Sequence, residues 1–233
     1  MSDLTAYIDL YCERTAQGFF NEPLNAVSNA SFIVAAWWAS RQFNEKQASP
    51  MFTALCVLAA LIGVGSIAFH TLPSRLTQWL DVIPIWAFVV TYTLAVTHAA
   101  FGKRWQYTSG IFGLGIVLLL IVFVVTGDAI SAAPSGANVH LFNGSLQYLP
   151  VVLVLLFFSV GASFMNHAIK HHLWWATGVF FVSLTCRTID IAVCGAFPSG
   201  THFLWHLLDG ILIAILLHGL FSTWHGANKE PTN

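Results

Sequence analysis

Three histidines lie at the edges of long apolar runs, where an ionisable side chain is costly. Ser66 and His70 stand four residues apart near the end of one run, and His202 and His206 stand four apart at the start of another. A spacing of four places two side chains on one face of a helix. Asp81 stands at the start of the run that follows His70. Because ionisable groups inside a bilayer cost about 2.5–3.5 kcal/mol each, those that persist are functional candidates.

These histidines are predicted to meet at one depth, since the run ending at His70 and the run beginning at His202 reach the same end of a bundle of membrane-crossing helices. Three neutral imidazoles that leave a position for water are typical of a catalytic zinc site. The alternative is three hydrogen-bonded packing residues. His98 and His218, which fall near the opposite end, could in principle clamp a haem.

The composition indicates which solvent surrounds the chain. Of its 233 residues, 57% are hydrophobic and 8% are charged, whereas soluble domains carry about 25% charged residues. So few charges cannot cover a surface that faces water, so we expect lipid to be the main solvent. The formal net charge of −1 gives no basic footprint for nucleic acid. No protein partner is evident from the sequence.

Runs of about 20 apolar residues are long enough to cross the hydrocarbon core of a bilayer. They do not alternate as the strands of a membrane barrel do. We therefore expect an all-α integral membrane protein, a single seven-transmembrane-helix bundle over 24–221 with an extramembrane amino-terminal segment, 1–23, and a carboxy-terminal tail, 222–233. The predicted helices are 24–41, 51–70, 80–98, 107–126, 146–165, 173–193 and 202–221.

The basic residues in the connections predict the orientation. Three Lys and Arg residues fall on the amino-terminal side of the bundle and six on the other. An excess of Lys and Arg marks the cytoplasmic side. We therefore expect the amino terminus outside or in a lumen, and the carboxy terminus in the cytosol.

Two of the four cysteines, Cys12 and Cys194, are predicted to fall on the amino-terminal side. In an oxidising compartment they could form a disulfide. The alternative is two reduced, buried thiols.

Five stretches of the sequence form a recognisable set: "YCERT", "NEPLNAVSN", "GVGSIAFHTLPSRLTQWLDVIP", "IDIAVC" and "THFLWH". Together they resemble the alkaline ceramidase family, which belongs to a superfamily of seven-helix membrane hydrolases that includes the adiponectin receptors. The most specific piece is Gly-x-Gly-Ser-x-x-x-His, followed eleven residues later by Asp and, near the end of the chain, by His-x-x-x-His.

The resemblance implies hydrolysis of ceramide, or a related N-acyl sphingolipid, to a fatty acid and a sphingoid base. It implies Zn²⁺ bound by His70, His202 and His206. Asp81 would take a proton from the attacking water and pass it to the leaving amine. Ser66 would hydrogen-bond the oxyanion or hold the water.

The resemblance also implies a Ca²⁺ site that joins the amino-terminal segment to the first helix. The family pattern there reads Asp-Trp-Cys-Glu-x-Asn, with a later Glu before an Asn-x-x-Ser-Asn motif. Glu13 and Glu22 match it, and Tyr11 stands at the Trp position, where a backbone carbonyl would serve. Thr15 stands at the Asn position, and Asp9 lies one residue too early. Oxygen ligands suit Ca²⁺; the alternative is an acidic, solvated turn.

Two other functions stay open at this point. A receptor-type member of the superfamily is one, although we see no long amino-terminal cytosolic domain. An intramembrane serine protease using Ser66 with a histidine is the other, but it leaves two histidines without a role. Among the remaining polar residues, Asp209 could orient His206 or contact another helix, and Arg187 and Asp190, three residues apart, could pair with each other.

Overall fold

The computed structural model describes residues 4–42, 49–101 and 141–227. Five helical stretches within them are long and apolar enough to cross a membrane. This confirms an all-helical chain with several candidate membrane spans. The predicted helix 107–126 lies outside the described residues, so the count of seven stays a prediction. The elements are α1 (Pro23–Ser28), α2 (Ala30–Arg41), α3 (Pro50–Thr71), α4 (Arg75–Phe101), the 3₁₀ segment η1 (Leu141–Tyr148), α6 (Leu149–Phe164), α7 (Lys170–Val193) and α8 (His202–Ala227).

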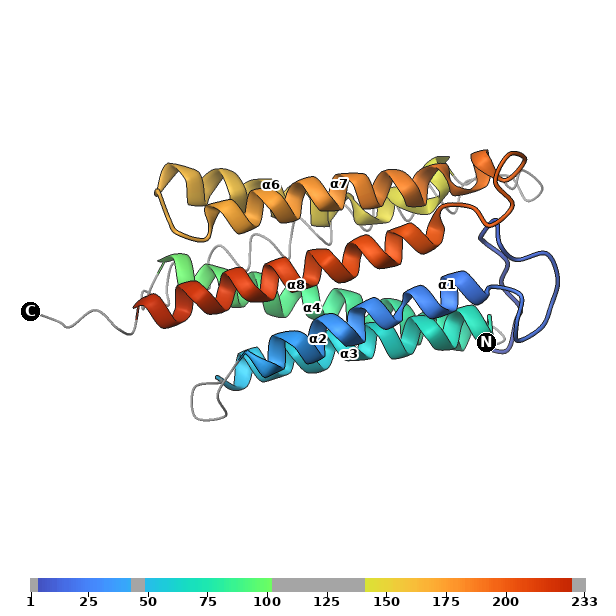
Figure 1. Ribbon diagram of the computed structural model, residues 1–233, viewed down its shortest axis with the longest axis horizontal. Coiled ribbons are helices and arrows are strands. Elements are labelled where there is room, and N and C mark those ends of the chain that lie inside the picture. Colours follow the sequence, from blue (N-terminus) through green and yellow to red (C-terminus); the bar gives the residue numbers. More distant parts are fainter. Residues whose placement is uncertain (1–3, 43–48, 102–140, 228–233) are drawn as a thin grey trace, which may run out of the picture.

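The first predicted helix, 24–41, is divided into α1 and α2 at Asn29. In a continuous helix the Asn25 carbonyl would accept the backbone N–H of Asn29. Here it accepts from the Ser28 hydroxyl at 2.9 Å and from the Asn29 side-chain amide at 2.7 Å, while the Asn29 N–H turns to the Val27 carbonyl. Ser and Asn side chains compete with helix bonds in this way. The two helices nevertheless run on in nearly the same direction (Figure 1).

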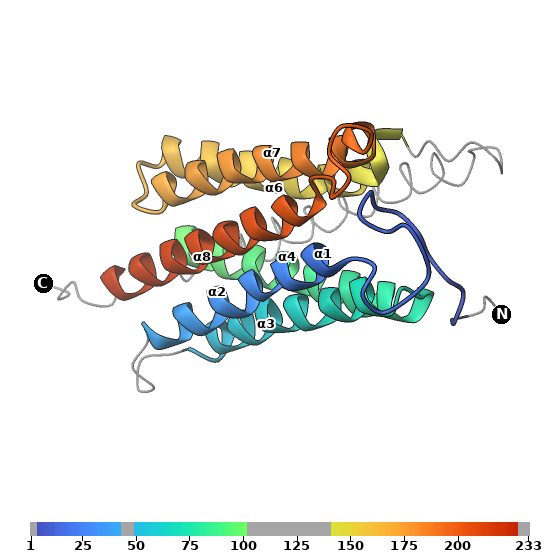
Figure 2. The same cartoon turned by 45° about the vertical axis from the view of Figure 1, so that its right-hand side comes forward.

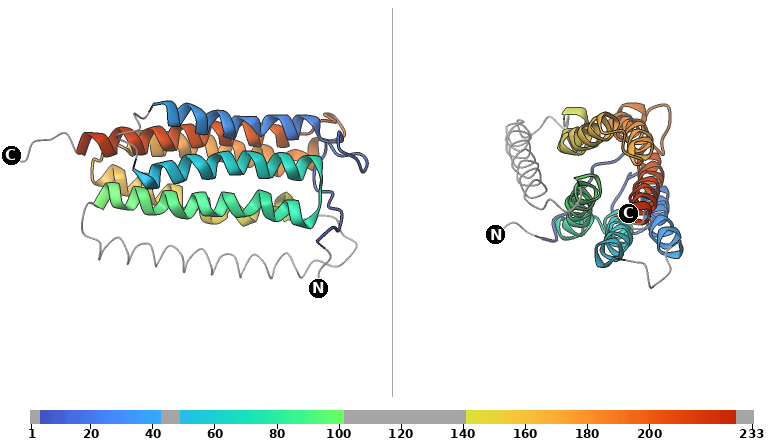
Figure 3. Two further views of the ribbon diagram at one scale, coloured as in Figure 1. Left: turned by 90° about the horizontal axis from the view of Figure 1, so that it is seen from below. Right: turned by 90° about the vertical axis from the view of Figure 1, so that its left-hand side faces the viewer.

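The long helices pack side by side around a common interior. α3 packs against α2 and α4, α8 against α2 and α7, and α7 against α6; the end-on view in Figure 3 shows this arrangement. Leu55, Ala59 and Leu217 are among the fully buried core residues. Large apolar side chains such as Phe157 and Trp175 are exposed on the outside, as expected of a surface that faces lipid.

α4 begins at Arg75, five residues before the predicted start. The prediction missed the first turn because that turn is polar. The Thr77 hydroxyl accepts the Ser74 N–H at 3.0 Å, and the Ser74 hydroxyl accepts the Thr77 N–H at 3.3 Å. Such reciprocal bonding satisfies donors at a helix start. The apolar pattern on which the prediction rested does not include this turn.

One end of the bundle collects the functional candidates. The end of α3, the start of α4, the end of α7 and the start of α8 lie there, and the amino-terminal segment passes over them (Figures 1 and 2). Backbone bonds tie this segment to the start of α4: Arg75 N–H donates to the Ala6 carbonyl at 3.2 Å and Leu76 N–H to the Leu4 carbonyl at 3.0 Å.

Candidate metal centre

The three predicted zinc ligands come together at that end. His70 from α3 and His202 and His206 from α8 are all buried, with exposed fractions of 1%, 2% and 3%. One ring nitrogen from each lies within 4.8 Å of the other two. Within residues 4–42, 49–101 and 141–227, no other group of three or more His, Cys, Asp or Glu side chains meets this condition. The group could hold a metal ion.

The ring nitrogens show how these histidines are arranged for a ligand. Nδ1 of His206 lies 2.8 Å from the Ser28 hydroxyl oxygen and 3.3 Å from the Asn29 side-chain nitrogen. Nδ1 of His70 bonds to the Glu22 carboxylate. Both rings therefore keep Nε2 for a metal. Nδ1 of His202 is buried without a hydrogen-bond partner, which is costly unless a ligand occupies it, so the donor set fits a metal ion.

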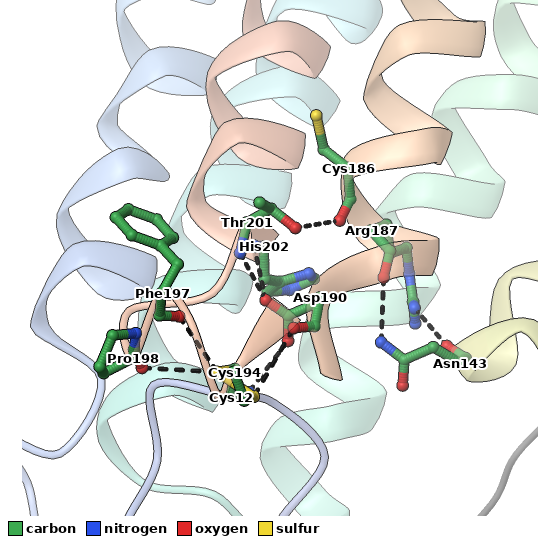
Figure 4. The surroundings of a disulfide bond; sticks show 10 residues. All are labelled: Cys12, Asn143, Cys186, Arg187, Asp190, Cys194, Phe197, Pro198, Thr201 and His202. Atoms are coloured by element: carbon green, nitrogen blue, oxygen red, sulfur yellow. Dashed lines mark hydrogen bonds between the residues drawn. A yellow bond between two sulfur atoms is a disulfide. The ribbon is translucent and has the colours of Figure 1, made fainter. Parts of the chain in front are cut away.

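His202 is held in place from two sides. Its ring stacks on Tyr11, with centroids 3.6 Å apart and planes 12° from parallel. Its backbone N–H donates to Asp190 at 2.9 Å. The same buried carboxylate accepts the N–H of Thr201 at 2.7 Å and that of Cys12 at 2.9 Å (Figure 4). Asp190 thus fixes the first turn of α8 and attaches the amino-terminal segment to it.

The spacing of three residues allowed Arg187 and Asp190 to pair, but in the structure each of them bonds to other groups. Arg187 donates to the Asn143 carbonyl at 2.7 Å (Figure 4), and its guanidinium lies over the Tyr148 ring, 5.2 Å from the centroid. Asp209 accepts from the Ser183 hydroxyl of α7 at 2.7 Å. Of the two alternatives for Asp209, the contact with another helix is therefore the one observed.

Ser66 and Asp81 lie next to each other beside the histidines. The Ser66 hydroxyl faces the Asp81 carboxylate. Gly65 allows this approach, because a Cβ atom there would collide with the Leu80 carbonyl oxygen. The backbones of α3 and α4 thus approach each other at Gly65 and Leu80, the residues directly before Ser66 and Asp81.

A cavity of about 760 Å³, including its open mouth, extends from this site into the bundle. Ser66, Asp81, His202 and His206 line its polar end. Its deeper walls are apolar and include Phe88, Val151, Leu155, Leu212 and Leu216. Pockets for small molecules commonly have mainly apolar walls and a few convergent polar groups.

Of the predicted Ca²⁺ ligands, Glu13 and Glu22 bond to other groups of the protein. Asp9 and Thr15 are exposed, and Glu13 accepts the backbone N–H groups of Leu24 and Asn25, each at 2.8 Å, at the start of α1. Tyr11 faces His202, and Glu22 bonds to Arg14 and His70. Burial raises the pKa of the Glu22 carboxyl, and Arg14 opposes this shift. Calcium binding stays a prediction.

Cys12 and Cys194 are joined by a disulfide, with their Cα atoms 5.6 Å apart (Figure 4). Cys194 directly follows α7, so the bond anchors the amino-terminal segment above the metal centre. Gly200, near the disulfide, has a left-handed backbone conformation with φ of +61°. A Cβ atom at this position would lie 2.6 Å from the Cβ of Cys12. Cys56 and Cys186 are free.

The sequence interpretation assigned no role to Ser28 or Asn29 and missed the contact of Glu22 with His70. A signal was present in "NEPLNAVSN". Asn25, Ser28 and Asn29 are spaced by three and four, so they share one helix face, and all are buried. A polar stripe directed into an apolar bundle requires partners there, and His206 is one of them.

Comparison with known proteins identifies the chain. A search of curated proteins gives no match. The family model described as Ceramidase matches residues 3–232, which include the three clustered histidines, Ser66 and Asp81. The chain therefore belongs to the ceramidase family.

Proposed function

We propose that the protein is a zinc-dependent intramembrane amidohydrolase that cleaves ceramide, or a related N-acyl sphingolipid, to a fatty acid and a sphingoid base. The observation that carries this proposal is the buried histidine triad at the polar end of an apolar cavity, in a member of the ceramidase family. An amide between two long tails matches this combination of a hydrolytic centre and an apolar chamber.

His70, His202 and His206 would hold the metal. Three neutral imidazoles suit Zn²⁺ in a catalytic site with one position left open. Bound Zn²⁺ polarises a carbonyl and lowers the pKa of a coordinated water to about 7.

The residues of the chain would then handle the protons. As water adds to the amide carbon, a C–O bond forms and the Asp81 carboxylate accepts a proton from that water. When the C–N bond breaks, Asp81 returns the proton to the leaving nitrogen. Acid–base steps of this kind contribute about 10²–10⁴-fold. The Ser66 hydroxyl would orient Asp81 and, on turning toward the substrate, donate to the developing oxyanion.

The cavity supports a placement for the substrate. The amide would lie between Asp81 and His202, and a tail would extend past Phe88 and Val151 toward Leu216, all of which line the same cavity. We further propose that the end carrying the disulfide faces an extracellular or lumenal compartment. Disulfides persist in oxidising compartments, and the basic residues of the sequence favour the same orientation.

The test is a hydrolysis assay on detergent-purified protein with a panel of ceramides, read by mass spectrometry beside metal analysis. We expect about one zinc per chain, release of fatty acid and sphingoid base, loss of turnover with a chelator and recovery with Zn²⁺. Turnover of glycerol esters but of no ceramide would contradict the proposal. Labelling of Ser66 by a fluorophosphonate would instead favour the serine protease, although Asp81 is the group beside that hydroxyl.

A further inference from the structure

Glu22 directly precedes α1 and is buried, with 2% of its surface exposed. One carboxylate oxygen accepts from Nε of Arg14, and the other bonds to Nδ1 of His70. The Asn25 side-chain amide donates to this second oxygen at 3.2 Å. Both oxygens are therefore used inside the protein, and one of their partners is a residue of the histidine triad.

Arg14 closes a ring of contacts with the same two residues. It is also buried, with 5% exposed, and its Nη2 donates to the backbone carbonyl of His70 at 2.8 Å. This carbonyl lies in the last turn of α3, where carbonyls lack partners within the helix and a positive charge is favourable. Arg14 holds the backbone of His70 while Glu22 holds its ring.

The chemistry of the contact determines which nitrogen of His70 carries the proton. An ionised carboxylate can only accept, so Nδ1 of His70 donates and Nε2 keeps its lone pair. Carboxylates placed in this way behind a metal-bound histidine fix the tautomer and the ring orientation, and they make the ligand more basic. His206 has the neutral Ser28 in the equivalent place. Glu22 is thus a charged group bonded directly to a ring of the triad, and Arg14 balances its charge.

We propose that Glu22 is a positioning residue of the metal centre, which holds the His70 ring with Nε2 directed to the metal, and that Arg14 locks Glu22 in place. The inference rests on the proposed metal-dependent function and deepens it. It gives the amino-terminal segment a direct part in metal binding and assigns Glu22 a role other than that of a Ca²⁺ ligand.

The experiment measures zinc affinity by competition with a chromogenic chelator, in calcium-free buffer, on detergent-purified protein. Glu22→Gln is expected to lower the affinity about 10–100-fold, the usual effect of losing such a partner. Glu13→Gln is the matched control, because it removes a carboxylate of the same segment that bonds only to backbone N–H groups of α1. It is expected to lower the unfolding temperature and to leave the zinc affinity at the wild-type value.

A second variant keeps the inference testable where Glu22→Gln does not fold. Glu22→Asp retains the charge that Arg14 needs but shortens the reach to His70. We expect it to fold, to bind zinc more weakly than wild type, and to change the absorption spectrum of bound Co²⁺, which a purely structural role would leave unaltered. Folded Glu22 variants with wild-type zinc affinity and an unchanged Co²⁺ spectrum would overturn the inference.

These measurements separate the inference from the proposed function, because metal titration needs no substrate. Wild-type protein that binds zinc but leaves every ceramide intact would refute the reaction and still allow the test of Glu22. Wild-type protein that hydrolyses ceramide, beside a Glu22→Gln variant with full zinc affinity, would refute the role of Glu22 alone.

Discussion

Histidines gather at both ends of this bundle, but within the described residues only one end forms a buried group of three that could hold a metal ion. At the opposite end the rings of His172 and His218 lie 5.4 Å apart. His218 approaches the Gln42 side-chain oxygen at 3.2 Å and the Trp38 ring, with centroids 5.8 Å apart. Both histidines there are partly exposed, and His218, considered above as a haem ligand, faces His172.

The difference between the two ends lies in what surrounds the rings. At the metal centre α3 supplies a third histidine, and α1 with the segment before it supplies the side chains behind Nδ1 of His70 and His206. The disulfide then holds this segment over the site. The group that could hold a metal ion thus differs from the pair at the opposite end in its third imidazole, its burial and the fixed orientation of its rings.

The largest expected effect is loss of the metal. Replacing His202 with Ala should remove most of the zinc and reduce ceramide hydrolysis to background, because three ligands leave no spare. His218→Ala, from the opposite end, should keep both. Metal analysis and the ceramide assay on each variant check this, and zinc retained at the wild-type level by His202→Ala would mean that the ligands are assigned wrongly.

The next largest expected effect is a slower hydrolysis rate in variants that keep their zinc. Asp81→Asn should keep the zinc and lower the rate about 10²–10⁴-fold, since an amide has nearly the same shape but cannot accept the proton. Ser66→Ala should cost about 10²–10³-fold, as expected for one donor to an oxyanion. Single-turnover rates on zinc-loaded protein provide the measurement. If Asp81→Asn lost its zinc, Asp81 would be a ligand and not the proton carrier.

Removing the disulfide should have a smaller effect on the free energy of unfolding. Cys12→Ser combined with Cys194→Ser is expected to destabilise the protein by about 2–4 kcal/mol and to weaken zinc binding, because Tyr11 and Asp190 lose their fixed relation at His202. Cys186→Ser, which changes a free cysteine, is the control. Thermal unfolding in detergent gives the comparison, and equal stability of the two variants would show that the bond does not hold the segment.

The smallest expected effect tests how closely α3 and α4 must approach. Gly65→Ala would push against the Leu80 carbonyl, and such overpacking typically costs about 1–3 kcal/mol. It should also slow hydrolysis by separating Ser66 from Asp81. Gly178→Ala is the matched control, because nothing lies within 4 Å of a Cβ there. Equal rates for the two variants would argue against the close approach as a catalytic requirement.

Within the described residues, the sequence predicted the long helices because apolar length is a local property. It predicted the convergence of His70 with His202 and His206 because the direction of each crossing follows from the order of the runs. The division of the first helix at Asn29 was not predicted, because it depends on which hydrogen-bond donors the Asn25 carbonyl accepts. The first turn of α4 escaped because it is polar.

Contacts between distant segments were harder to predict. Glu22 and His70 are 48 residues apart, and nothing in either stretch specifies that one reaches the other. Nothing in the pattern around Gly65 identified Leu80 as the neighbour that requires a glycine there. For Glu13 and Glu22, motif similarity gave residue types and positions, whereas their contacts with the start of α1 and with Arg14 depend on the fold.

The path of the amino-terminal segment also has a consequence for biosynthesis. Its residues leave the ribosome first, yet Tyr11 stacks on His202 and Cys12 bonds to Cys194, which is 182 positions further along the chain. The segment must therefore wait, without its partners, until α7 and the beginning of α8 have been synthesised and inserted. Completion of this end of the bundle is thus a late event in assembly. A truncated or half-inserted chain lacks the contacts that Tyr11 and Cys12 make beside the three histidines.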